Sequence, residues 1–195
     1  MGTRGIYGFY KDGEDKLSYN HMDSYPSVLG RDVVRFVEET SIEEMNEIFD
    51  RIQMVLENEE PSEIQIKRLE EYAKTETRHG IKIGEGTEKN WYNLLRSAQG
   101  DLFAFKDGLS FMIDSRNFIK ESLFCEWGWI INLDDEVLEV YRGFNYEPTY
   151  HRYSLDEPYD PDYSDDKYYA CERLIKFPLE DIPSDWEKQI EGRVE

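Results

Sequence analysis

The chain has 195 residues, of which 43 are Asp or Glu and 23 are Lys or Arg, so its formal net charge at pH 7 is −20. Phosphates of nucleic acids and of anionic lipids would repel this charge, which argues against direct binding to either. Hydrophobic residues make up 39% of the chain and aromatic residues 14%, enough large side chain to build a core, so disorder throughout is also excluded.

The surplus of acid is concentrated in two segments. Residues 38–76 hold 13 acids and 4 bases, a net charge of −9, and residues 146–172 hold 8 acids and 2 bases, a net charge of −6. Because a block of like charges opposes compaction by self-repulsion, we expect both segments to be displayed at the surface as contact surfaces for a partner.

The length of the chain favours a single domain over residues 1–195, with an acidic, tyrosine-rich loop or insertion at about residues 146–169. Folding at this length hides about 70% of the surface of the unfolded chain, so the core needs no disulfide, and we expect Cys125 and Cys171 to be buried free thiols. The chain opens with no secretory signal, and no apolar stretch approaches the roughly 20 residues of a membrane span. We therefore expect a soluble cytoplasmic protein.

In chain order, the first predicted element is a β-hairpin. Residues 3–10 alternate small and aromatic side chains, Lys11-Asp12-Gly13 is a strong turn signal, and residues 15–20 form the return strand. Ser41 and Glu44 form a capping box that opens a helix, whose inner face is predicted to hold Ile42, Met45, Ile48, Phe49, Ile52 and Leu56.

Further helices are predicted after Pro61, with Ile64, Leu69 and Tyr72 inward, and from a Thr87 cap through Trp91 to Leu95, ending at Gly100. Residues 102–122 fit strand or helix. Residues 123–133 and 137–144 predict a central hairpin buried on both faces, or on one face plus a partner, and residues 170–177 predict a last strand before a helix capped by Ser184. This order predicts an α+β fold, an antiparallel sheet built from an N-terminal and a central β-hairpin and packed against a cluster of helices.

The opening residues resemble those of a family of uncharacterised bacterial and phage-borne proteins, which begin with Met, then Gly or Cys, then Thr-Arg. The resemblance rests on Met1 to Gly5, on residues 19–26, on Leu29-Gly30, and on residues 132–141, which are similar to the central hairpin of that family. It covers about a quarter of the chain. It implies a host cytoplasmic location if the gene is phage-borne.

A remoter similarity is to N-terminal-nucleophile hydrolases, in which a Cys, Ser or Thr at the mature N-terminus is activated by its own α-amine. This similarity implies amide hydrolysis with Thr3, Arg4, Asn20 and Asp23 as candidate catalytic residues. Methionine removal should expose Gly2, which has no nucleophile, so Thr3 could act only if Gly2 were also removed. Independently, His21 could be a base oriented by Asp23, or Asp23 could belong to a turn network before Pro26.

No cofactor and no metal are expected. The spacings of the histidines and cysteines fit no zinc pattern. Asp160, Asp162, Asp165 and Asp166 lack the glycine and distal Glu of a calcium loop. The glycines of residues 80–86 do not follow a phosphate-binding order, although Lys82 and Lys89 would be the phosphate partners if they did.

The residues of the acidic loop predict protein binding. It holds seven of the 14 tyrosines. Aromatic residues are enriched at interfaces, and spaced carboxylates can imitate a phosphate backbone. The candidate partner-binding residues are Tyr150, Tyr153, Asp156, Glu157, Tyr159, Asp160, Asp162, Tyr163, Asp165 and Asp166.

The preferred hypothesis is therefore an acidic interaction module that binds and inhibits a basic, nucleic-acid-binding partner, as a phage counter-defence inhibitor or nucleic-acid mimic. The alternatives are an N-terminal-nucleophile-type amidohydrolase or its inactive relative, and a small-molecule or nucleotide-binding module with Trp91, Trp127 and Trp129 around a pocket. The sequence leaves the oligomeric state open and favours binding over catalysis.

Overall fold

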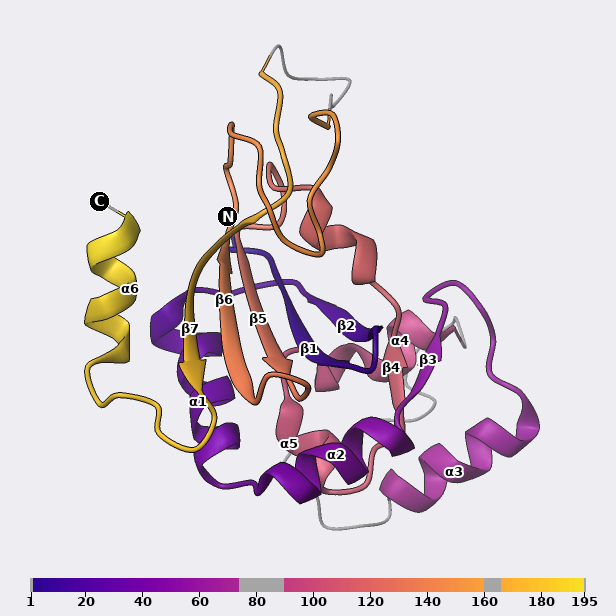
Figure 1. Cartoon of the computed structure of the whole chain (residues 1–195). Coiled ribbons are helices and arrows are strands. Elements are labelled where there is room, and N and C mark those ends of the chain that lie inside the picture. The colour runs from indigo at the N-terminus through magenta and orange to yellow at the C-terminus, as the bar shows by residue number, and fades with distance from the viewer. Residues whose placement is uncertain (1, 74–89, 160–165, 195) are drawn as a thin grey trace.

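The computed structural model describes residues 2–73, 90–159 and 166–194, and its centre is a five-stranded sheet in the order β2-β1-β5-β6-β7 (Figure 1). Neighbouring strands are antiparallel, except that β1 and β5 run parallel. The α+β prediction and both predicted hairpins are confirmed; the parallel pairing of the two hairpins is new. The strands are β1 (Gly5–Lys11), β2 (Glu14–Asn20), β5 (Trp127–Asn132), β6 (Val137–Arg142) and β7 (Glu172–Pro178).

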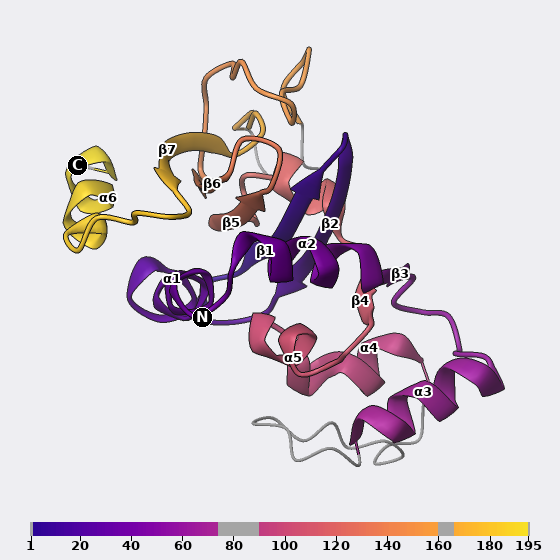
Figure 2. The same ribbon diagram turned by 60° about the horizontal axis from the view of Figure 1, so that its bottom comes forward.

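Helices cover one face of this sheet, and Figure 2 shows α1, α2 and α5 together on that side. None of the helices in the described ranges has the length and apolar character that a membrane crossing requires. The helical segments are η1 (Pro26–Gly30), α1 (Arg31–Glu38), α2 (Ile42–Arg51), α3 (Glu63–Ala73), α4 (Trp91–Leu95), η2 (Arg96–Ala98), α5 (Leu102–Lys106), η3 (Arg116–Lys120) and α6 (Trp186–Val194).

The sheet is buried on both faces, and every residue of β5 is buried. On the helix-covered face, Phe9, Trp129 and Val140 belong to the larger core. On the opposite face, Ile130 and Tyr141 pack in a smaller core whose other members are Ile6, Leu17, Ile119, Cys125, Tyr153 and Cys171. The smaller core has a loop cover that includes η3 and the chain after β6, so the prediction of burial on both faces is confirmed.

Two predicted inner positions are wrong. The helix that the Ser41 cap opens ends at Arg51, because the next residues form β3 (Gln53–Val55), which pairs in parallel with β4 (Phe111–Ile113). Leu56 then follows the strand and is 54% exposed, and Ile64 on α3 is 68% exposed. Strand pairing overrides the helical periodicity at Leu56. Ile64 lies in the first turn of α3, whose buried residues are Leu69 and Tyr72. Strand β4 also resolves part of the ambiguous stretch 102–122.

The predicted Thr87 cap lies outside the described residues. Within them, α4 begins after Asn90, whose side chain accepts a hydrogen bond of 3.0 Å from the backbone N–H of Asn93. The cap at Ser41 is present: its hydroxyl oxygen accepts from the backbone N–H of Glu44 at 3.2 Å. Side-chain acceptors of this kind satisfy amides that have no partner inside the first helical turn.

The close packing of the N-terminal hairpin makes Gly8 a test of this fold. Gly8 has φ +142°, and a Cβ there would lie 2.1 Å from the backbone oxygen of Lys16. We expect Gly8→Ala to lower the free energy of unfolding by about 3 kcal/mol or more, from backbone strain plus overlap across the hairpin. Urea unfolding measures this. Gly192→Ala on α6 is the control, since no atom lies within 4 Å of its Cβ position, and it should be neutral or slightly stabilising.

Candidate partner-binding projection

The long connection between β6 and β7 is described over residues 143–159 and 166–171, and we call these residues the projection (orange in Figure 1). It packs on the sheet around Arg152 and Tyr153 and extends beyond the sheet elsewhere. Its two arms are joined near the far end by an antiparallel bridge, in which Tyr159 and Tyr168 exchange backbone hydrogen bonds of 2.6 and 3.0 Å. At its base, the side-chain amide of Asn145 donates to the carbonyls of Glu147 and Ala170, at 2.8 and 2.9 Å. The arms are thus tied to each other at two levels.

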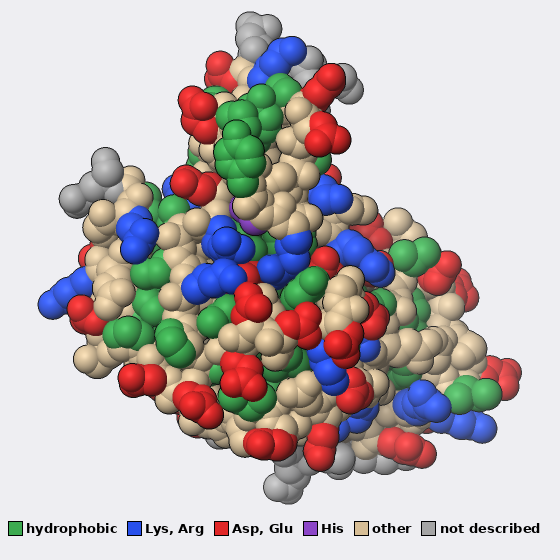
Figure 3. All heavy atoms as spheres, viewed as in Figure 1, with side chains coloured by type: hydrophobic (Ala, Val, Ile, Leu, Met, Phe, Trp, Pro, Cys, Tyr) green, Lys and Arg blue, Asp and Glu red, His purple; other side chains and the backbone are tan. Residues whose placement is uncertain are grey.

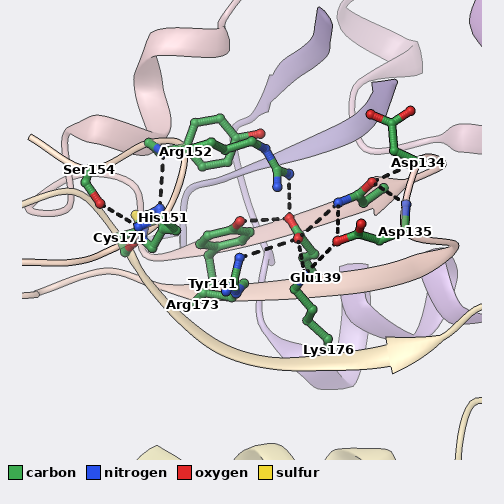
Figure 4. Close-up of polar contacts among 12 residues, drawn as sticks. Asp134, Asp135, Glu139, Tyr141, His151, Arg152, Ser154, Cys171, Arg173 and Lys176 are labelled. Carbon is green, nitrogen blue, oxygen red and sulfur yellow. Dashed lines mark hydrogen bonds and ion pairs between the residues drawn. The ribbon is translucent and has the colours of Figure 1, made fainter. Parts of the chain in front are cut away.

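The projection is fastened to the sheet by a buried carboxylate, Glu139, on the face of β6 opposite the large helices. Glu139 is fully buried and accepts hydrogen bonds from Tyr141 Oη at 2.8 Å, from Asn132 Nδ2 at 3.3 Å and from the guanidinium of Arg152 on the projection (Figure 4). Lys176 Nζ and Arg173 Nη1 of β7 lie 3.3 and 3.6 Å from its oxygens. One carboxylate therefore joins two neighbouring strands to the projection.

The pKa of Glu139 shows which effect dominates at this site. Burial alone raises the pKa of a carboxyl group, but the hydrogen bond and positive charge of Arg152, with the bonds from Tyr141 and Asn132, outweigh burial and lower the pKa of Glu139 to about 2. The group is therefore an anion at neutral pH, and its ion pair with Arg152 is intact.

Two aromatic rings pack against the guanidinium of Arg152, and we call His151, Arg152 and Tyr153 the anchor. The guanidinium of Arg152 lies 4.1 Å from the ring centroid of Tyr10 and 4.6 Å from that of Tyr153. The hydroxyl of Tyr153 donates to Asp15 Oδ1 at 2.5 Å. Two aromatic faces and one ion pair thus fix the side chain of Arg152 against β1 and β6.

His151 completes the anchor as a neutral ring. Its Nδ1 accepts from the backbone N–H of Tyr153 at 3.2 Å, so the proton is on Nε2, which donates to the carbonyl of Cys171 at 3.0 Å. Burial lowers the pKa of His151, and the nearby positive charges of Arg173 and Arg152 act in the same direction, although the bond to Cys171 opposes them. His151 is therefore a fixed structural contact between the two arms at neutral pH.

Above the anchor, the projection exposes aromatic and acidic side chains. Tyr150 is 94% exposed and Tyr146 is 53% exposed, with the Tyr146 ring packed on Tyr168 at 4.8 Å between centroids. Figure 3 shows hydrophobic side chains on the projection flanked by Asp and Glu, above a band of Lys and Arg over the sheet. The exposed acids of its described part are Glu147, Asp156, Glu157 and Asp166.

The candidate residues of the acidic loop thus divide into three groups. Tyr150, Asp156, Glu157 and Asp166 are exposed and Tyr159 is half-buried. Tyr153 is 3% exposed and belongs to the anchor, so the expectation that it lies on the exposed surface of the loop is wrong. Asp160, Asp162, Tyr163 and Asp165 lie outside the described residues.

A second acidic surface lies at the junction of α1 and α2. A cleft of about 750 Å³ there has carboxylates at its rim and apolar side chains such as Met45 and Leu179 in its wall; the acids are Glu38, Glu39, Glu43, Glu180 and Asp181. Elsewhere on α2 the acid is partly neutralised, since Asp50 pairs with Lys11 at 2.9 Å and Glu44 with Lys106 at 3.3 Å.

The candidate catalytic residues are only partly brought together. Asn20, His21 and Asp23 line a cleft of about 410 Å³ beside α1 and residues 96–103, whereas Thr3 and Arg4 are not among its lining residues. The guanidinium of Arg4 instead lies 5.0 Å from the centroid of the Phe124 ring.

The His21–Asp23 pair is not assembled as a base and its orienting acid. His21 Nδ1 bonds to Tyr19 Oη at 3.1 Å, and Asp23 accepts from the hydroxyl of Tyr25 at 2.8 Å. The turn interpretation of Asp23 is therefore the one that the contacts support, and its φ of +57° fits a turn.

The tryptophans expected around a pocket lie in the core instead. Trp91, Trp127 and Trp129 are at most 7% exposed, so they form no open pocket. Cys125 and Cys171 are buried free thiols. The glycines of residues 80–86 lie outside the described residues, within which no group of three or more His, Cys, Asp and Glu side chains could hold a metal ion.

Reasoning from the sequence missed the Glu139 cluster. A signal was present: Glu139 is an acid in the middle of a mostly apolar strand, on the same face as Tyr141 and Val137. Arg152 is the one base between Tyr146 and Asp166 in the acidic loop. A buried charge requires a partner, but the sequence could not say that these two residues, 13 positions apart, would meet.

The anchor gives a pH prediction. Because the pKa of Glu139 is lower in the folded chain than its usual value of about 4.5, its stabilising contribution is present above pH 4.5 and is lost as the pH falls towards 2. We expect Glu139→Gln to lower the free energy of unfolding by about 3 kcal/mol at pH 7. The gap between wild type and variant should close between about pH 5 and pH 2.

Chemical denaturation across this pH range measures the gap. Glu136→Gln, at an exposed position of the β5–β6 turn, is the matched control and should leave a small, flat difference. A gap for Glu139→Gln that does not change with pH would contradict an ionised, Arg-paired carboxylate.

Comparisons of the chain with protein-family models, with curated proteins and with solved structures found no match. The projection combines exposed tyrosines and acids with a buried ion pair that fixes its base to the sheet.

Proposed function

We propose that this protein is an acidic interaction module that binds a basic surface of a nucleic-acid-binding partner protein and inhibits that partner. One observation carries the proposal: Tyr150 is 94% exposed among acids, on a projection whose base is fastened by the buried Glu139–Arg152 pair. An aromatic side chain left in water on a well-anchored element is typical of a binding surface.

The anchor supports binding because it reduces the entropy lost on association. A flexible acidic loop would have to be ordered by its partner, whereas the contacts of Asn145, Arg152 and Tyr153 already order the base of the projection. The net charge of −20 adds long-range attraction for a basic partner, which raises the association rate and makes it sensitive to salt.

Inhibition follows from competition. A partner that binds nucleic acid presents Lys and Arg to phosphates, and a surface with spaced carboxylates such as Glu147, Asp156 and Glu157 can occupy the same groups. The resemblance to phage-borne proteins supports a counter-defence role in a host cytoplasm. The acidic cleft at the α1–α2 junction would add a second contact of the same sign.

One observation favours a second candidate, an amidohydrolase of the N-terminal-nucleophile type or its inactive relative: Asn20, His21 and Asp23 share a cleft. Intact-mass measurement of the purified protein distinguishes the two. A chain that begins at Gly2 has no nucleophile there, and a chain that begins at Thr3 would favour the hydrolase.

Charge reversal on the projection tests the interaction proposal. We expect the immobilised wild-type protein to retain basic proteins from a nuclease-treated bacterial lysate at about 50 mM NaCl and to release them at about 0.5 M. Asp156→Lys/Glu157→Lys should weaken binding of the identified partner roughly tenfold, because both side chains are exposed and face a like-charged surface after reversal.

The matched control is Asp107→Lys/Glu191→Lys, which changes the net charge by the same amount. Asp107 is exposed directly after α5, and Glu191 is exposed on α6. The control should lose much less affinity, and both variants should keep the unfolding free energy within about 0.5 kcal/mol of wild type. Equal losses for the two variants would show that net charge alone drives retention, and no retained basic protein at low salt would remove the proposal.

A further inference from the structure

A hollow lies where the first arm of the projection meets the start of β7. Its volume is about 320 Å³, which is large enough for one long side chain of a partner. It is lined by Asn145, Glu147, Pro148, Thr149, Tyr150, His151, Glu172 and Arg173.

The charge that this hollow offers to a partner is negative. Glu147 and Glu172 are both exposed, and within the described part of the chain neither carboxylate takes part in an ion pair or a side-chain hydrogen bond. Arg173, the one permanent cation in the wall, has its Nη1 3.6 Å from the buried Glu139, and Figure 4 shows its guanidinium on the Glu139 side. His151 is neutral, since its ring is a donor to Cys171 and an acceptor from Tyr153.

The hollow also has an aromatic wall. Tyr150 is 94% exposed, so most of its ring is open to solvent, and Pro148 beside it is exposed too. A cation within about 6 Å of an aromatic ring centroid is attracted by the negative face of the ring. An anion would meet two like charges, and an uncharged group would leave both carboxylates unpaired when it excluded water.

We propose that this hollow is the seat of a lysine or arginine side chain of the basic partner, with the ring of Tyr150 against the cation and Glu147 and Glu172 as its counter-ions. The inference rests on the proposed interaction function and assigns it a recognition point. The anchor fixes this point, because His151 is both a wall of the hollow and a contact between the two arms.

Titration with a defined cationic peptide tests the hollow. An octalysine peptide is titrated into the ¹⁵N-labelled full chain at low salt, with octaarginine in a parallel titration and octaglutamate as the negative control. We expect backbone shifts centred on Tyr150, His151 and Glu172. Tyr150→Ala should weaken binding about two- to fivefold and Tyr150→Phe should keep it, since Phe retains the ring face.

A matched pair of double variants separates the hollow from the general field. Glu147→Gln/Glu172→Gln and Asp156→Asn/Glu157→Asn each remove two exposed acids from the projection or its border, and only the first pair lines the hollow. The first should weaken octalysine binding more than the second. If the two double variants lose the same affinity, or if the shifts are centred elsewhere, the hollow is not the recognition point. The proposed acidic interaction module would be unaffected by that result. No binding of either peptide by the wild type would overturn both.

Discussion

The ion pair between Glu139 and Arg152 is the interaction on which the candidate site depends. Glu139 is fully buried, so its charge is tolerated only because Arg152, Tyr141 and Asn132 all donate to it. Removing any one donor would leave the buried Glu139 carboxylate with fewer hydrogen bonds in a site that excludes water. The pair therefore fixes the position of Arg152, and with it the neighbouring residues of the projection, on β6.

That constraint explains how a strongly acidic chain can present an ordered surface. Many described bases pair with acids on the body of the protein, as in Lys11–Asp50, Arg31–Glu187 and Arg116–Asp114. These pairs neutralise single acids on the body, whereas Glu147, Asp156 and Glu157 on the projection have no such partner within the described residues. Exposed acids are thus present on the projection and also around the cleft at the α1–α2 junction.

The two faces of the sheet are packed in different ways. Helices cover one face with the larger core, and that face carries most of the buried apolar surface. The other face is half apolar, with Ile130 and Tyr141, and half polar around Glu139. A polar half-face can bind a charged loop in one orientation, because hydrogen bonds are directional and apolar packing alone is not.

The sequence by itself determined the fold class, both hairpins, the Ser41 cap and the acidic character of residues 146–172, because each depends on turn chemistry, periodicity or charge within a short window. Only the tertiary structure decided that β1 and β5 run parallel, that Gln53–Val55 leaves the helix for a strand, and that Tyr153 turns inward. It also decided that Arg152 meets Glu139. These outcomes depend on partners distant in sequence, and burial and pairing energies between such residues exceed the local preferences that a sequence pattern records.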